Sequence, residues 1–279
     1  MDDIFVSTDW LAAHLGDPAL ALLDCSWFLP NANRRPHEEY LASHIPGAVF
    51  FDIDGVADKT TGLPHMLLPP AEFGEAVGAL GVGDGTTIVL YDEAGLFSAP
   101  RVWWEFEAMG ATDIRILAGG GPKWRAEGRP LDSGDAHPTP RKFTPRFRPE
   151  LLRDRDQVRQ AITAGQMVVD ARPNGRFIGR DPEPRPGVVN GHMPGSVSVP
   201  SADLVADGGL KPVAELRSIF DKAGVDLHRP LIASCGSGVT AALDMLALRL
   251  AGADNVSLYD GAWAEWGSRT DTPIIRDEQ

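Results

Sequence analysis

The chain has 279 residues, of which 43% are hydrophobic and 23% are charged, and it carries a formal net charge of −13. Such a length allows one large domain or two medium domains, each burying its own core. The acidic balance argues against nucleic acids and anionic membranes as partners, and no apolar run approaches the roughly 20 residues of a membrane span.

The first residues and the cysteine content suggest a compartment. The opening MDDIFVSTDWLAAHL is acidic and lacks the basic region of a signal peptide and the arginines of a transit peptide. The two cysteines, Cys25 and Cys235, lie far apart in the sequence, and a disulfide would consume the nucleophile argued for below. We therefore expect a reducing, cytoplasmic environment in which both thiols are free.

Taken in chain order, the elements of the first half are repeated in the second half. The matching stretches are ALLDCSW at 21–27 and MVVDAR at 167–172, HIPGAVFFDID at 44–54 and HMPGSVSVP at 192–200, and the segments 86–124 and 229–266. Each half alternates apolar strand patterns with helical periodicity, which predicts an α/β domain with a mainly parallel sheet flanked by helices. The duplication predicts two such domains in tandem.

Residues 125–149, between the two copies, form a proline-rich stretch with little periodicity. Its prolines are Pro130, Pro138, Pro140, Pro145 and Pro149. Prolines at this density favour an extended chain, so we expect a linker that packs on the surface. The predicted N-terminal domain then covers residues 1–124, and the predicted C-terminal domain covers residues 150–279.

Cys235 lies where a predicted strand ends and a predicted helix begins. The apolar run Leu231–Ala233 is typical of a buried parallel strand, and from Val239 onward apolar residues recur at helical spacing. The glycines between them let the backbone turn its N–H groups inward, and a helix N-terminus favours an anion. Since helix N-termini lower the pKa of thiols, we predict that Cys235 is a thiolate nucleophile at neutral pH. The alternative is a small, buried, apolar cysteine.

Three chemistries use a cysteine in a loop of this kind. A cysteine phosphatase needs an arginine six positions after the cysteine, where this chain has Ala241, so the sequence argues against it. Acyl transfer of the papain type needs a neighbouring base, and no local signature supplies one. Sulfur transfer, in which the cysteine carries a sulfur atom as a persulfide, needs only a reactive thiolate and a loop lined with donors.

The loop Cys235-Gly236-Ser237-Gly238-Val239-Thr240-Ala241 resembles the active loop of the two-domain rhodanese family, of the 3-mercaptopyruvate sulfurtransferase type. The resemblance spans both halves and implies tandem rhodanese-like domains. It implies that Cys235 takes sulfur from 3-mercaptopyruvate and that four loop residues help to bind this substrate: Gly236, Gly238, Val239 and Thr240. Relatives that use thiosulfate carry two side chains, often Arg-Lys, at the positions of Gly236 and Ser237, so thiosulfate is the nearest alternative donor.

The same resemblance implies a proton relay of three residues. His65 lies in a loop of the first half, ADKTTGLPHMLLPP, that has no counterpart in the second half. In the family, the residues that match Asp54 and His65 are partners of the loop serine, here Ser237. A carboxylate that orients an imidazole, which in turn serves a hydroxyl, can move a proton on or off the donor thiol.

An arginine-rich loop in the second half, RPNGRFIGRDPEPRPGVVNGH, suggests capture of an anion in an otherwise acidic protein. Guanidinium groups match carboxylates bidentately. The resemblance implies that Arg176 and Arg185 bind the carboxylate and keto oxygen of the substrate. We expect the other two cations of this loop, Arg172 and Arg180, to be solvated charges balanced by neighbouring carboxylates.

The two halves differ at the position of the nucleophile. Aligning them places Asp92 opposite Cys235, and because aspartate cannot accept sulfur, we expect a catalytically silent N-terminal domain. His44 and His192 occupy equivalent positions in the HIPG and HMPG stretches of the two halves, which favours a structural role for both.

Together, these residues predict a sulfurtransferase that forms a persulfide on Cys235 and releases pyruvate as its enolate. A second thiol, such as thioredoxin or a small thiol, or cyanide then removes the outer sulfur. This chemistry needs no metal or organic cofactor, and the scattered His, Cys and carboxylate residues show no metal-ligand spacing. A non-catalytic sulfur-relay or binding module is the alternative from a different class.

Overall fold

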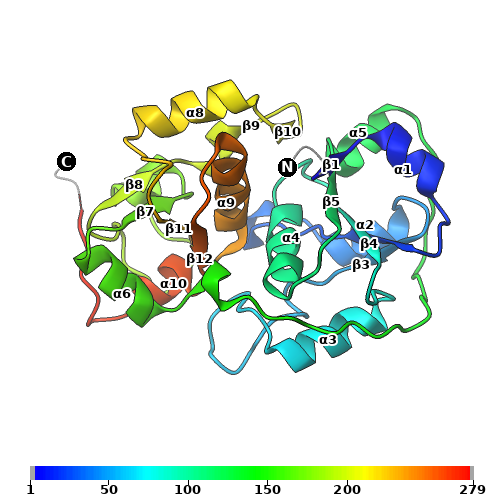
Figure 1. The fold of residues 1–279 in the computed structure, drawn as a ribbon, viewed down its shortest axis with the longest axis horizontal. Coiled ribbons are helices and arrows are strands. Elements are labelled where there is room, and N and C mark those ends of the chain that lie inside the picture. The colour runs from blue at the N-terminus through cyan, green and yellow to red at the C-terminus, as the bar shows by residue number, and fades with distance from the viewer. Residues whose placement is uncertain (1–3, 277–279) are drawn as a thin grey trace. The chain divides into compact units, whose positions relative to one another are not determined.

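The computed structural model describes residues 4–276 and divides into two compact units (Figure 1). The first unit comprises the chain up to Asp58, together with Leu67–Arg148 and Asp207–Gly209. The second comprises Lys59–Met66, Pro149–Ala206 and the chain from Leu210 onward. Each unit thus includes one short segment from the opposite half of the sequence, and His65 belongs to the second unit.

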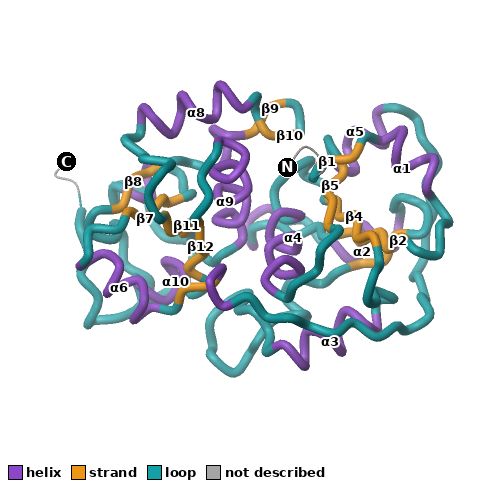
Figure 2. Tube along the Cα trace, viewed as in Figure 1, coloured by secondary structure: helices purple, strands orange, loops and turns teal. Residues whose placement is uncertain are grey.

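The first unit is a five-stranded parallel sheet flanked by helices (Figure 2). Its strands lie in the order β1-β5-β4-β2-β3. In chain order its elements are β1 (Phe5–Val6), α1 (Thr8–His14), β2 (Leu20–Asp24), the 3₁₀ turn η1 (Pro30–Ala32), α2 (Pro36–Ala42), β3 (Ala48–Phe50), α3 (Pro70–Ala79), β4 (Thr87–Tyr91), α4 (Ala99–Ala108), β5 (Ile114–Leu117) and α5 (Gly120–Ala126).

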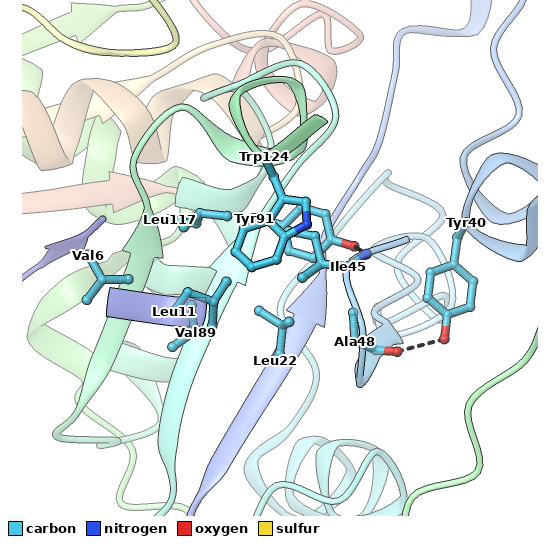
Figure 3. Close-up of a cluster of buried hydrophobic side chains, with 10 residues drawn as sticks. All are labelled: Val6, Leu11, Leu22, Tyr40, Ile45, Ala48, Val89, Tyr91, Leu117 and Trp124. Carbon is cyan, nitrogen blue, oxygen red and sulfur yellow. Dashed lines mark hydrogen bonds between the residues drawn. The ribbon is translucent and has the colours of Figure 1, made fainter. Parts of the chain in front are cut away.

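The apolar faces of β2, β4 and β5 pack against α1, α2 and α5 to form one core of the first unit (Figure 3). Two tyrosines in this core keep their polar ends satisfied. The hydroxyl of Tyr40 donates to the carbonyl of Ala48 at 2.8 Å, and the hydroxyl of Tyr91 accepts from the backbone N–H of Ile45 at 3.4 Å. Because a parallel sheet is covered on both faces, its strands read as apolar runs rather than as alternating patterns.

The second unit repeats this topology with the strand order β6-β12-β11-β7-β8, again all parallel. In chain order the elements of residues 149–276 are η2 (Pro149–Leu151), β6 (Leu152–Arg153), α6 (Arg155–Thr163), β7 (Met167–Asp170), α7 (Asn174–Phe177), β8 (Ser196–Ser198), η3 (Ser201–Leu204), β9 (Val205–Ala206), β10 (Gly209–Leu210), α8 (Val213–Lys222), β11 (Leu231–Ser234), α9 (Val239–Ala251), β12 (Val256–Tyr259) and α10 (Ala262–Trp266). Strands β9 and β10 pair in a separate two-stranded sheet. The predicted pair of parallel α/β domains is therefore confirmed. The two-residue edge strands β1 and β6 were not predicted, because they are too short to carry a periodicity.

The proline-rich stretch is extended and is held on the first unit. The backbone N–H of Arg141 donates to the carbonyl of Gly78 at 2.9 Å, and that of Arg146 donates to the carbonyl of Met109 at 2.8 Å. A Cβ atom at Gly78 would lie 2.5 Å from the carbonyl oxygen of Arg141, so only glycine allows this approach. Phe143 anchors the stretch by packing against aromatic rings of α3 and α4.

The two equivalent histidines have matching structural environments. Nδ1 of His44 lies 2.8 Å from the carbonyl oxygen of Tyr40, and its ring stacks on that tyrosine. Nδ1 of His192 lies 3.0 Å from the carbonyl oxygen of Phe177, and its ring stacks on that phenylalanine. Both rings are buried and hold turns in place, which agrees with a structural role. No helix within residues 4–276 is long and apolar enough to cross a membrane.

Candidate active site

The loop that carries Cys235 joins β11 to the buried helix α9. Gly238 is the N-cap of this 13-residue helix, and its φ of +83° is left-handed, which favours glycine. The N–H of Gly238 donates to Sγ of Cys235 at 3.1 Å. The loop is also held from α10, because the N–H groups of Trp263 and Ala264 donate to the carbonyls of Cys235 and Gly236 at 2.8 and 2.9 Å. The sulfur is therefore fixed at the positive end of a helix, beside a backbone donor, with 2% of the residue exposed.

The equivalent loop of the first unit shows what such a turn stabilises. Asp92 follows β4 just as Cys235 follows β11, and its side chain is almost fully buried. Its carboxylate accepts four backbone N–H groups at 2.8–3.0 Å, those of Ala94, Phe97, Ser98 and Ala99. Hydrogen bonds of this kind favour an ionised acceptor. One copy of the duplicated loop thus directs four backbone donors at a carboxyl group, and the other copy directs the N–H of Gly238 at the thiol of Cys235.

Arg176 lies against the Cys235 loop. It projects from the short helix α7, and its guanidinium is paired with Glu183 through Nε and Nη2. A Cβ atom built on Gly236 would lie 2.9 Å from Nη2 of Arg176. The absence of a side chain at Gly236 therefore leaves the space that the guanidinium fills. The structure brings this predicted substrate residue next to the predicted nucleophilic loop.

His65 and Arg185 meet in the second unit, although 120 residues separate them in the sequence. Nη2 of Arg185 lies 3.4 Å from Nε2 of His65, whose side chain is buried. The backbone of His65 is left-handed, with a φ of +58°, a conformation that side-chain-bearing residues adopt only when their surroundings impose it. The imidazole is thus held in one place beside a predicted substrate cation.

The remaining members of the proposed relay are placed as follows. Ser237 lies two residues after the nucleophile on the same loop and is 6% exposed. Oδ2 of Asp54 accepts a hydrogen bond from the indole of Trp27 at 3.0 Å, and Asp54 belongs to the first unit. The relay among Asp54, His65 and Ser237 remains a prediction. Val239 and Thr240, the other predicted contacts, form the first turn of α9.

Arg172 is not the solvated charge that we predicted. It is 1% exposed, donates to both carboxylate oxygens of Asp170 and to Glu183 at 2.7–3.1 Å, and lies over the ring of Trp263 at 4.3 Å. Burial alone would lower the pKa of Arg172, but the two carboxylates outweigh it and raise that pKa above its ordinary value. The prediction was correct for Arg180, which is exposed and pairs with a neighbouring aspartate.

This buried ion-pair cluster lies next to the nucleophile because of the sheet register. Asp170 ends β7 and pairs with Ser234, the residue before Cys235, on the adjacent strand β11. The carboxyl ends of parallel strands are where α/β folds place their sites. We missed Glu183 as a site residue. The aspartate at the end of a buried strand, two residues before Arg172, was the signal that could have indicated a buried pair.

Asp244 is a second buried acid of this unit, on α9. It is fully buried, and within residues 4–276 neither of its carboxyl oxygens has a hydrogen-bond partner. Burial raises its pKa well above the ordinary 3.8, and the nearby Cys235, Asp170 and Asp203 raise it further. An unpaired buried charge is costly, so burial favours the protonated form of this carboxyl.

Asp244→Asn is therefore expected to remove a pH-dependent loss of stability. The folded protein retains a proton that the unfolded chain releases, so the contribution of Asp244 is complete below about pH 3.8 and declines as the pH rises towards its folded pKa. Between pH 4 and pH 8, the free energy of unfolding should shift in favour of the variant by more than about 1 kcal/mol, the order of one pKa unit. Urea unfolding at several pH values measures this, with the exposed Asp221→Asn as control. A constant difference across the range would show that Asp244 is not the linked group.

Within residues 4–276, no group of three or more His, Cys, Asp or Glu side chains is arranged to hold a metal ion. Both cysteines are free thiols.

Comparison with known proteins gives consistent matches over nearly the whole chain. The Rhodanese-like domain family matches residues 7–127 and again residues 154–269. The 3-mercaptopyruvate sulfurtransferase of Escherichia coli (strain K12) is 43% identical over 272 residues, which cover 97% of this chain and 97% of that protein. The thiosulfate sulfurtransferase of Rattus norvegicus is 42% identical over 273 residues, which cover 95% of this chain and 92% of that protein. The crystal structure of SseA from Escherichia coli, described as a 3-mercaptopyruvate sulfotransferase, matches with a TM-score of 0.86 at 42% identity and covers 93% of this chain and 98% of that one.

Proposed function

This chain belongs to the rhodanese family, and we propose that it is a sulfurtransferase that moves sulfur from 3-mercaptopyruvate through a persulfide on Cys235 to a thiol or cyanide. The observation that carries the proposal is the placement of Cys235 Sγ at the N-terminus of α9, hydrogen-bonded to a backbone N–H, with the guanidinium of Arg176 against the same loop. This arrangement places the proposed nucleophile beside a group that can bind a carboxylate.

The proposed reaction begins with the binding of the donor. Arg176 and Arg185 bind the carboxylate and keto oxygen of 3-mercaptopyruvate and place its sulfur beside Cys235. The thiolate of Cys235 attacks that sulfur, so an S–S bond forms while the C–S bond of the donor breaks. The electron pair of the broken bond passes to the carbon fragment, which leaves as the enolate of pyruvate. The N–H groups of the loop stabilise negative charge as it moves between the two sulfurs.

A proton must then move from the donor thiol to the enolate. We assign this transfer to Ser237, served by His65 and Asp54, because an imidazole can both accept and donate a proton. In this scheme Arg185 binds the keto oxygen of the donor. Because Arg185 lies beside His65, the imidazole stays close to that oxygen. Transfer of the outer sulfur to a second thiol, such as thioredoxin or a small thiol, or to cyanide regenerates Cys235.

The first unit is proposed to be catalytically silent. Its equivalent loop carries Asp92, whose carboxylate already uses the backbone donors that would stabilise a reacting sulfur. One active site per chain follows. We propose a reducing, cytoplasmic compartment for the protein, because the persulfide chemistry requires that Cys235 stay a free thiol.

Thiosulfate is a second candidate donor, since a relative named for it is 42% identical. Thiosulfate is a dianion, and the loop offers it no charged side chain at Gly236 or Ser237. Incubation with 3-mercaptopyruvate should therefore add one sulfur to Cys235 by mass spectrometry and release pyruvate, with a kcat/KM at least about tenfold higher than that for thiocyanate formation from thiosulfate and cyanide. A higher kcat/KM for thiosulfate would overturn the donor assignment while leaving sulfur transfer in place.

A further inference from the structure

Glu183 is positioned to control which edge of the Arg176 guanidinium meets a ligand. A guanidinium can pair with a carboxylate through its side edge, Nε with Nη2, or through its end edge, Nη1 with Nη2. Nε of Arg176 donates to Oε1 of Glu183 at 3.3 Å, and Nη2 donates to Oε2 at 2.5 Å. The side edge is thus occupied within the protein, and the end edge remains for a substrate. Of the atoms of Arg176, Nη2 lies closest to the position a Cβ of Gly236 would take, at 2.9 Å, with Nη1 at 3.7 Å.

Glu183 is itself held from behind by the buried cluster. Nη1 of Arg172 donates to Oε1 of Glu183 at 2.8 Å. Nε and Nη2 of Arg172 donate to the carboxylate of Asp170 at the end of β7. Glu183 is 3% exposed on its side chain, and Arg172 and Asp170 are each 1% exposed. The charges alternate from Asp170 through Arg172 and Glu183 to Arg176, so each ion has a partner of opposite sign. This series of ion pairs connects β7 to Arg176, the proposed substrate-binding residue, through the buried side chains of Arg172 and Glu183.

We propose that Glu183 is a positioning residue that orients Arg176, leaving its end edge for the carboxylate of the donor. The proposal rests on the function proposed above. Glu183 acts through Arg176 and does not contact the reacting sulfur. A glutamine at this position would have the same volume, but one oxygen would become an N–H₂ group that faces a guanidinium. Arg176 would then lose one acceptor and its opposite charge, and its edges would no longer be distinguished.

Glu183→Gln is expected to raise the KM for 3-mercaptopyruvate by about tenfold or more while changing kcat by less than about threefold, because binding weakens and the thiol is untouched. Asp181→Asn is the matched control, since Asp181 lies two residues away on the same loop and pairs with the exposed Arg180. It should leave both constants unchanged. In an Arg176→Gln background, Glu183→Gln should have almost no further effect, within about twofold, because the two residues act as one unit.

A second measurement reads the same geometry without sulfur transfer. 3-Bromopyruvate carries the carboxylate and keto group of the donor and alkylates the thiolate of Cys235, forming an S–C bond and releasing bromide. Its half-saturation concentration should rise about tenfold in Glu183→Gln, while alkylation by neutral iodoacetamide stays within about twofold, since only the anionic reagent uses Arg176.

These measurements separate the two proposals. If the wild-type protein releases no pyruvate from 3-mercaptopyruvate, the proposed function fails, and the labelling with 3-bromopyruvate still decides the role of Glu183. If Glu183→Gln matches Asp181→Asn in the bromopyruvate labelling, or in KM, the positioning role is wrong. An effect of Glu183→Gln that is equally large with and without Arg176 would also overturn it, since Glu183 would then act by another route.

Discussion

Replacing Cys235 with serine is expected to lower the rate of pyruvate release from 3-mercaptopyruvate by at least about 1,000-fold. A hydroxyl oxygen cannot carry the transferred sulfur as a persulfide, and it is far less acidic than a thiol. The serine oxygen can still accept the N–H of Gly238, so the loop and α9 should keep their structure. Steady-state pyruvate release and the mass of the intact protein after incubation with the donor measure the two consequences.

Cys25→Ala is the control for this experiment. Cys25 is fully buried at the end of β2, and burial, with Asp24 and Asp92 nearby, raises the pKa of its thiol well above the ordinary 9.0. The Cys25→Ala variant should therefore keep its activity and gain one sulfur on Cys235. Retention of pyruvate release by Cys235→Ser would show that the nucleophile lies elsewhere. Absence of any sulfur adduct on the wild-type protein would favour a binding module over an enzyme.

The fold could be predicted because its signals are local and repeated. The strands β7 and β11 and the long helix α9 are almost entirely buried, so their sequences are mainly apolar. The duplication supplied each signal twice, and a strand-glycine-helix sequence around Cys235 placed the thiol at a helix N-terminus. Each of these signals lies within one short segment, and the duplication is found by comparing such segments between the two halves of the sequence.

The parts of the site that could not be predicted depend on contacts between distant segments. Arg172 was expected in solvent because its loop is rich in proline and charge, but the ring of Trp263 and the carboxylate of Asp170 enclose it. Glu183 is one of two acids in that loop, and its position between Arg172 and Arg176 distinguishes it from the exposed Asp181. The inclusion of His65 in the second unit likewise follows from tertiary contacts and not from any pattern in its own segment.

The equivalent loops of the two units use their backbone donors differently. In the first unit, four backbone N–H groups donate to the carboxyl oxygens of Asp92, so this turn directs its donors at the residue that follows the strand. In the second unit, a shorter turn with Gly236 and Gly238 holds a sulfur in the equivalent place, and Arg176 approaches from α7. The two copies of the loop therefore differ in what they hold: one holds a carboxyl group that already accepts four backbone N–H groups, and the other holds the proposed nucleophilic thiol.

Arg185→Gln is expected to reduce the kcat/KM for 3-mercaptopyruvate by about 100-fold, since a hydrogen bond to a charged group contributes about 1.5–3 kcal/mol and each 1.4 kcal/mol is a factor of ten. Glutamine can donate a single N–H₂ group and carries no charge, so it can neither pair bidentately with a keto acid nor keep its cationic contact with His65. Alkylation of Cys235 by iodoacetamide should stay within about twofold of the wild-type rate, because the nucleophile itself is unchanged.

Arg180→Gln is the matched control for this change. Arg180 lies in the same loop, but its side chain is 63% exposed and pairs with Asp181 in solvent, so its loss should leave kcat/KM within about twofold of the wild-type value. If Arg185→Gln and Arg180→Gln behave alike, the cation that binds the substrate is not Arg185, and Arg176 must hold the carboxylate unaided. If Arg185→Gln lowers the rate of alkylation by iodoacetamide as strongly as it lowers kcat/KM for 3-mercaptopyruvate, then Arg185 supports the thiolate and not the substrate. The role assigned here to the loop amides would then belong to this guanidinium group.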